Sequence, residues 1–92
     1  MKKFDEAIKV YQEQISLYPK NVNGYFNISV VCNLLEDKKK SLFYLDAGLK
    51  ELSNNYLLLY SKGKTYLKYR DYVLALKFLL KCEKIKSSNN KD

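Results

Sequence analysis

Apolar residues recur along this chain at intervals of three and four, which is the spacing of one face of an α-helix. The first such stretch covers residues 3–18, and its apolar face is formed by Phe4, Ala7, Ile8, Tyr11, Ile15 and Tyr18. Pro19 follows directly, and a proline ring clashes with the preceding turn of a continuing helix. The pattern therefore predicts an amphipathic helix over residues 3–18 that ends at the proline.

Four further stretches show the same periodicity and predict helices over residues 22–35, 39–52, 56–69 and 72–86. Short polar segments with turn-forming residues separate them, and such brief connections favour antiparallel neighbours. Gly48 lies inside the predicted third helix, where a glycine costs about 1 kcal/mol relative to alanine, so we expect a close helix crossing there. Residues 87–92 are polar, and we expect them to be frayed.

The pattern is also repeated at a fixed distance. A shift of 34 residues places Phe26 on Tyr60 and Asp37 on Asp71. Repeats of this length, made of two amphipathic segments, are typical of helical solenoids. We therefore predict one all-α domain, an α-solenoid of antiparallel helix pairs with five helices. Residues 1–21 would form the second helix of a partial unit, residues 22–55 and 56–89 two full units, and residues 90–92 a tail.

The repeated positions carry a recognisable motif, W-x2-L-G-x2-Y followed by A-x3-F and P. The four motif positions of the first block are occupied by Tyr25, Ile28, Ser29 and Cys32 in one unit, and by Leu59, Lys62, Gly63 and Tyr66 in the next. The second block appears as Ala7 and Tyr11, Ser41 and Leu45, and Ala75 and Leu79, with Pro19 in the proline position. On these positions the chain resembles the tetratricopeptide repeat family. Lys62 departs from the motif, since its aliphatic stem must replace a leucine. The alternative to a repeat fold is an unrelated helical bundle whose periodicity is accidental.

The amino-acid composition favours some classes of partner and of location but does not identify a function. Seventeen Lys and Arg against ten Asp and Glu give a net charge of +7, which suits nucleic acid, an anionic membrane surface or an acidic protein partner. A solvated lysine-rich surface is the interpretation that we favour. Cys32 and Cys82 fall on apolar faces, which predicts buried free thiols and a reducing, cytoplasmic location. No apolar run approaches the ~20 residues that a membrane-spanning helix needs.

Catalytic chemistry finds little support in the sequence. The chain has no histidine, the usual acid or base near neutral pH, and no glycine-rich phosphate loop. Its acidic pairs, such as Glu36 and Asp37, are adjacent in sequence, so their side chains point apart. Cys32 has no histidine to activate it. We therefore expect no enzymatic activity, no metal and no cofactor.

The family resemblance implies a ligand groove along the leading helix of each full unit. The residues that it would present are Asn23, Phe26, Asn27, Val30, Asn33, Leu34, Leu57, Tyr60, Lys64, Leu67 and Lys68. Asparagine side chains offer a donor and an acceptor to a peptide backbone, and Phe26 and Tyr60 supply apolar anchors. Lys64 and Lys68 would attract an acidic ligand. Ordinary packing between helices is an equally weighted interpretation of Phe26 and Tyr60.

The function that we expect from the sequence is a protein-interaction scaffold that holds a peptide or partner protein in this groove. The first unit lacks a leading helix and no polar capping helix follows the last unit, whereas repeat arrays need polar ends. A fragment of a longer array, a dimer that uses one end as its interface, and a truncated domain all fit. Self-association into a homodimer or a longer array is thus the alternative function, and RNA binding is the least favoured.

Overall fold

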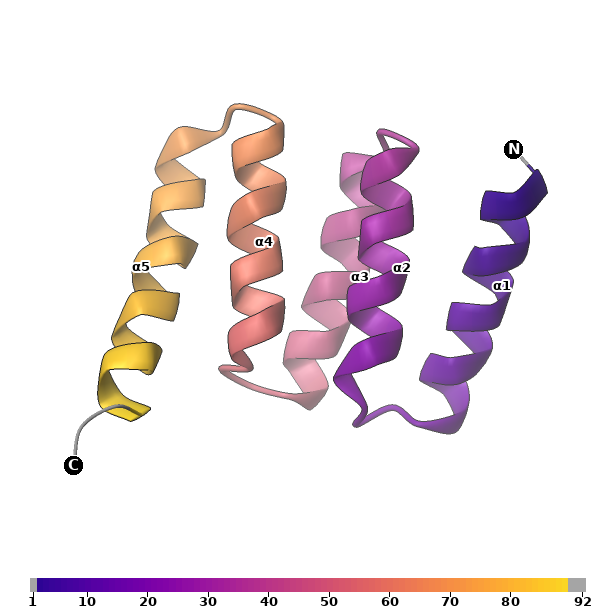
Figure 1. Ribbon diagram of the computed structural model, residues 1–92, viewed down its shortest axis with the longest axis horizontal. Coiled ribbons are helices and arrows are strands. Elements are labelled where there is room, and N and C mark those ends of the chain that lie inside the picture. The colour runs from indigo at the N-terminus through magenta and orange to yellow at the C-terminus, as the bar shows by residue number, and fades with distance from the viewer. Residues whose placement is uncertain (1, 90–92) are drawn as a thin grey trace.

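The computed structural model describes residues 2–89, which form five α-helices that run alternately up and down (Figure 1). They are α1 (Lys2–Leu17), α2 (Val22–Leu34), α3 (Lys38–Glu51), α4 (Tyr56–Lys68) and α5 (Tyr72–Asn89). The predicted tail, residues 90–92, lies outside the described residues. No strand occurs within residues 2–89, and the predicted all-α helical-repeat fold is confirmed.

The predicted limits of the first four helices agree with the structure to within one residue at each end. The fifth helix was expected to end at residue 86, but α5 continues to Asn89, so the prediction that residues 87–89 are frayed is wrong. These residues are Ser, Ser and Asn, whose helix propensity is modest but far better than that of proline. A polar composition without a breaking residue therefore did not end the helix.

The turns inside the two full hairpins are copies of one another. The backbone N–H of Asp37 donates to the carbonyl of Cys32 at 2.8 Å, and 34 residues later the N–H of Asp71 donates to the carbonyl of Tyr66, also at 2.8 Å. These bonds satisfy carbonyl groups that the end of a helix would otherwise leave without a partner. The sequence repeat is thus a repeat of hydrogen bonds as well as of apolar positions.

Backbone conformation and helix caps follow the same period. Glu36 and Arg70 both adopt a left-handed φ, 60° and 63°, which closes each turn and is uncommon for residues other than glycine. Asn21 and Asn55 precede the two leading helices, and the side-chain oxygen of each accepts a backbone N–H from the first helical turn, at 2.9 and 3.1 Å. Asparagine is among the best residues for this position, so both helices begin where their sequence directs.

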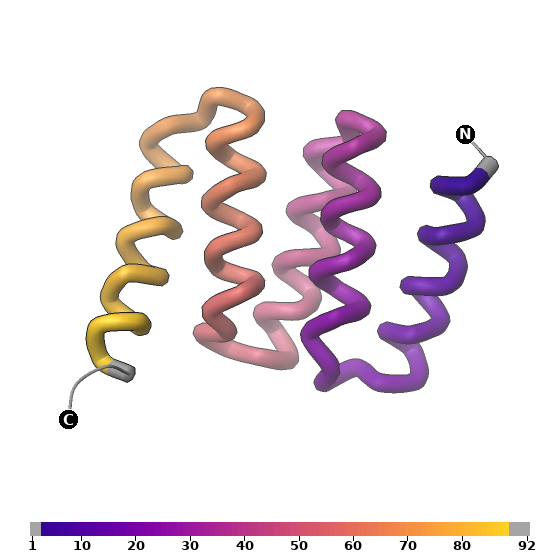
Figure 2. Tube along the Cα trace, viewed as in Figure 1, coloured from indigo at the N-terminus to yellow at the C-terminus, as the bar shows by residue number. Residues whose placement is uncertain are grey.

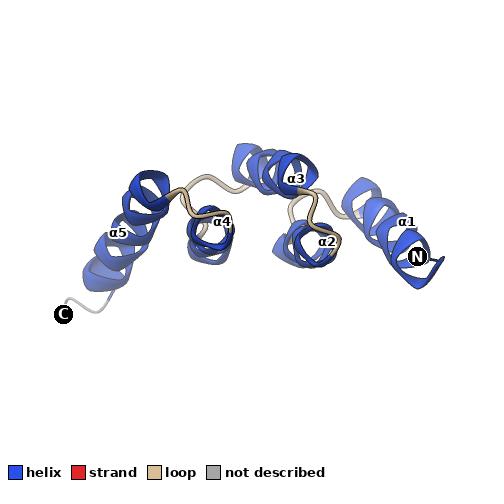
Figure 3. Cartoon of the chain, turned by 90° about the horizontal axis from the view of Figure 1, so that it is seen from above, coloured by secondary structure: helices blue, strands red, loops and turns tan. Residues whose placement is uncertain are grey.

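The helices lie in two curved layers (Figure 3). Helices α1, α3 and α5 form an outer arc, and the leading helices α2 and α4 lie inside it; Figure 2 shows the chain alternating between the layers. A core of Tyr25, Leu45 and Leu58 joins the two hairpins. Gly48 lies directly against it, because a Cβ atom there would be 2.8 Å from Tyr25 Cγ and 2.9 Å from Leu58 Cδ1. The close crossing predicted at this glycine is confirmed.

The departure at Lys62 is accommodated between the hairpins. Its side chain is mostly buried, and its Nζ donates to Asp46 Oδ1 of α3 at 2.5 Å. The same ammonium group lies 4.5 Å from the centre of the Phe78 ring, where the negative face of an aromatic ring attracts a cation. The aliphatic stem thus replaces the expected leucine while Asp46 and Phe78 stabilise the charge.

Candidate functional site

A groove of about 220 Å³ lies between α2 and α4, the two helices inside the arc (Figure 3). Its lining residues are Phe26, Ser29, Val30, Asn33, Leu57, Tyr60, Ser61 and Lys64. Helical geometry explains why they gather, because residues three, four and seven apart share one face of a helix. The leading helices of successive units therefore each contribute one stripe of side chains to the same groove.

The walls of the groove are mainly apolar. Phe26 and Leu57 are half-buried, whereas Val30 and Tyr60 keep about two fifths of their surface exposed. The Tyr60 ring stacks on Tyr56, one turn earlier, with ring centres 6.1 Å apart and planes 5° from parallel. This stacking restricts the Tyr60 ring, so its exposed face is available at little further entropic cost.

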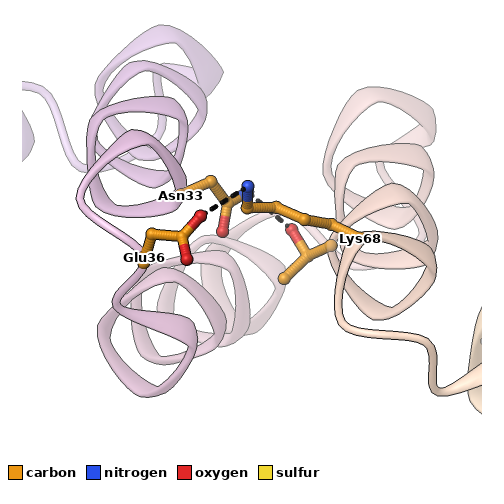
Figure 4. A network of polar contacts seen from close by, with 4 residues as sticks. Asn33, Glu36 and Lys68 are labelled. Carbon is orange, nitrogen blue, oxygen red and sulfur yellow. Dashed lines mark hydrogen bonds and ion pairs between the residues drawn. The ribbon is translucent and has the colours of Figure 1, made fainter.

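Asn33 places a polar group in the groove lining. Its Nδ2 donates to Thr65 Oγ1 at 2.9 Å, which links α2 to α4 (Figure 4). Its Oδ1 is buried and has no hydrogen-bond partner among the described residues. A buried acceptor without a partner costs roughly 1–3 kcal/mol.

The two lysines expected to attract an acidic ligand lie in different surroundings. Lys68 Nζ donates to Glu36 Oε1 at 3.3 Å, so an acid of the α2–α3 turn already neutralises part of its charge (Figure 4). Lys64 lines the groove, is exposed and forms no ion pair within residues 2–89. Lys64 is therefore the cation that the groove itself offers.

The structure brings six of the eleven predicted residues to the groove lining: Phe26, Val30, Asn33, Leu57, Tyr60 and Lys64. The other five lie on the same two helices but outside this lining: Asn23, Asn27, Leu34, Leu67 and Lys68. Ser29 and Ser61 line the groove and were not predicted. Their spacing could have identified them, since Ser29 follows Phe26 by three residues and Ser61 follows Leu57 by four.

Neither a metal-binding cluster nor an activated cysteine occurs among the described residues. No group of three His, Cys, Asp or Glu side chains within residues 2–89 is placed to hold a metal ion. Both cysteines are buried and free. Burial raises the pKa of the Cys32 thiol, with Asp37 adding to the effect, and burial raises the pKa of Cys82, with Glu83 adding to it. Raised pKa values disfavour the reactive thiolate.

Comparison with known proteins supports the motif assignment. Residues 1–21 match the family model described as tetratricopeptide repeat, and the family resemblance is confirmed. No curated protein matches the chain. Repeats of this family generally mediate protein–protein interactions, and the family is one of non-enzymatic repeat scaffolds. Among the described residues, none of the helices is long and apolar enough to cross a membrane.

Proposed function

We propose that the groove between α2 and α4 binds a peptide segment of a partner protein, since residues 1–21 match the tetratricopeptide repeat family and repeats of this family generally mediate protein–protein interactions. The observation that carries this proposal is one concave site, lined by two successive leading helices, that combines apolar walls with a few polar residues such as Asn33 and Lys64. Such a combination of an apolar pocket and a few convergent polar groups is typical of binding sites.

The apolar walls select the first feature of the ligand, which is a large apolar side chain. Phe26, Leu57 and Tyr60 form a surface that such a side chain would cover, and aromatic contacts of this kind dominate the energy of many interfaces. The rigid stacking of Tyr56 on Tyr60 lowers the entropy lost on binding. A peptide without an apolar residue at this point would bind weakly.

The polar groups select two further features. The Ser61 hydroxyl in the lining can donate a hydrogen bond to a backbone carbonyl of the peptide or accept one from a backbone N–H. Lys64 lies on the lining and would attract an acidic residue next to the apolar one. Added salt would screen this attraction because the charge is exposed, but the loss of affinity would be small because only one surface charge is involved.

The test begins with a peptide selected from a random linear library on the immobilised chain. We expect the double variant Phe26→Ala/Tyr60→Ala to bind this peptide at least tenfold more weakly by calorimetry, because two anchors of roughly 1 kcal/mol or more each are removed. The matched control is Phe43→Ala/Tyr72→Ala, which removes two exposed aromatic residues from outer helices α3 and α5. Circular dichroism would confirm that both variants keep their helicity.

The two variants separate the possible outcomes. Equal affinity of the double variant and the unchanged chain would contradict the groove assignment, and so would a loss that the control shares. A chain that captured RNA instead, with affinity falling steeply as salt increases, would contradict the peptide proposal as well.

For the location we infer a reducing compartment such as the cytoplasm, which suits the two buried free thiols.

A further inference from the structure

A second pocket, of about 430 Å³, lies between α5 and the turn that joins α3 to α4 (Figure 1). Its volume falls within the range of about 300–1,000 Å³ that is typical of small-molecule sites. The lining consists of Asn54 from the turn and of Lys81, Lys84, Ile85 and Ser88 from α5. Asn54 belongs to the first full unit and the other four residues to the second, so the pocket forms where two successive units meet.

Hydrogen-bond donors dominate the lining of this pocket. Each of its two lysines carries an ammonium group with three donors, Ser88 has a hydroxyl group, and Asn54 has a side-chain amide. Neither Lys81 nor Lys84 forms an ion pair within residues 2–89. Glu83, the nearest acid along the chain, is about 100° further round the helix than Lys84 and is not part of the lining. The pocket therefore offers donors and positive charge.

Further positive charge lies directly beside the pocket. The Nζ atoms of Lys77 and Lys81 are 5.9 and 5.8 Å from the centre of the Phe78 ring, and the Nζ atom of Lys62 is 4.5 Å from the same centre. Within residues 2–89, Asp46 is the only acid that forms an ion pair with any of these lysines, and its partner is Lys62. The like charges repel one another, and a bound anion would reduce this repulsion.

The repeat does not require this charge. One repeat length earlier, Ala47 occupies the position of Lys81, and Glu51 occupies the position of Ile85. The equivalent place in the first full unit thus has one lysine fewer and a carboxylate in addition. Packing of the solenoid is therefore no explanation for the lysine pair of the pocket, which is a feature of the second unit alone.

The charge of the whole chain is distributed in the same sense. Residues 38–89 contain twelve Lys and Arg against four Asp and Glu, whereas residues 2–37 contain four against five. The positive charge is thus concentrated in α3, α4 and α5, the elements that surround the pocket. Such an uneven distribution attracts anions and raises the rate at which they reach the site.

We propose that this pocket binds a small soluble molecule that carries two linked phosphate groups. Lys81 and Lys84 are three residues apart, about 4.5 Å along the helix axis, so each ammonium group would meet one of two adjacent phosphates. Asn54 and Ser88 would donate to further phosphate oxygens. Both lysines are exposed, so we expect a Kd of about 0.1–1 mM. The inference goes beyond peptide binding, because the pocket shares no lining residue with the groove.

Titration of the nitrogen-15-labelled chain with inorganic pyrophosphate, at constant ionic strength, tests the proposal. We expect saturable changes in the amide chemical shifts of Asn54 and of residues 81–88, and no such changes with sodium chloride of the same ionic strength. The double variant Lys81→Ala/Lys84→Ala should bind pyrophosphate about tenfold more weakly, because both ammonium groups of the lining are removed.

The matched control is Lys39→Ala/Lys40→Ala, which removes two exposed lysines from the start of α3 and should leave the affinity unchanged. Circular dichroism would confirm that both variants keep their helicity. An equal loss of affinity in the two variants would overturn the proposal, because it would indicate a diffuse attraction to lysines. The absence of saturable shifts up to about 10 mM pyrophosphate would overturn it as well.

Vesicles of phosphatidylcholine and phosphatidylinositol bisphosphate distinguish a soluble ligand from a lipid headgroup. Capture of the chain on these vesicles, without a saturable response to pyrophosphate, would contradict the proposed soluble ligand. The groove variant Phe26→Ala/Tyr60→Ala should bind pyrophosphate as the unchanged chain does, since neither residue lines the pocket. Failure of this proposal and failure of the groove proposal are therefore distinguishable.

Discussion

Replacing Leu45 with alanine should lower the free energy of unfolding by about 3 kcal/mol. Leu45 is 0% exposed and belongs to the core that joins the two full hairpins. The lost methyl groups and the cavity left between helices both contribute. Small domains are stable by only about 5–15 kcal/mol, so the change would remove a large share of the total. Urea denaturation followed by circular dichroism measures it.

Leu76→Ala is the matched control, because it removes the same atoms from a side chain that is 58% exposed on α5. We expect this variant to change the free energy of unfolding by less than about 0.5 kcal/mol. Similar losses at the two positions would mean that the contact between hairpins does not depend on the Tyr25, Leu45 and Leu58 core. The account of how successive units hold together would then be wrong.

Replacing Gly48 with alanine should also destabilise the chain, by about 2 kcal/mol, although alanine is the better helix former by about 1 kcal/mol. The added Cβ would lie 2.8 Å from Tyr25 Cγ, closer than carbon atoms approach without displacement. Tyr25 cannot easily move, because it is buried and its hydroxyl donates to the carbonyl of Pro19 at 2.6 Å. Overpacking therefore outweighs the gain in helix propensity. Thermal unfolding of the variant measures the difference.

Gly63→Ala is the comparison for this prediction. Its Cβ would meet the end of the Leu79 side chain, with Cγ and Cδ2 both at 2.9 Å. Leu79 is only half-buried and can change its rotamer, so we expect a smaller loss of stability than at Gly48. A stabilised Gly48→Ala variant would show that helix propensity, and not the crossing with α2 and α4, decides the residue at this position.

The sequence predicted most of the fold because its signals were local and consistent. Pro19, together with the asparagines at positions 21 and 55, marked helix boundaries that the structure reproduces. The end of α5 was missed because residues 87–89 are polar without being helix breakers. In that segment, composition indicated exposure to water, and exposure alone does not end a helix.

The lining of the groove was predictable only where side chains project from the shared faces of α2 and α4. Phe26 and Tyr60 are related by the repeat, and the structure places both in one lining. The hydrogen-bond partners of Asn33 and Lys68 could not be predicted from the repeat. Thr65 and Glu36 each lie 32 residues from the side chain that they contact, and the angle between hairpins decides whether such residues meet.

The central claim is that the inner face of α2 and α4 is the recognition surface, and amide chemical shifts measured during a peptide titration test it most directly. The labelled chain would be kept dilute, and the peptide would be the one selected from the random library. We predict the largest shifts at residues 26–33 of α2 and 57–64 of α4, with little change on the outer faces of α3 and α5. Shifts concentrated on those outer faces would contradict the account.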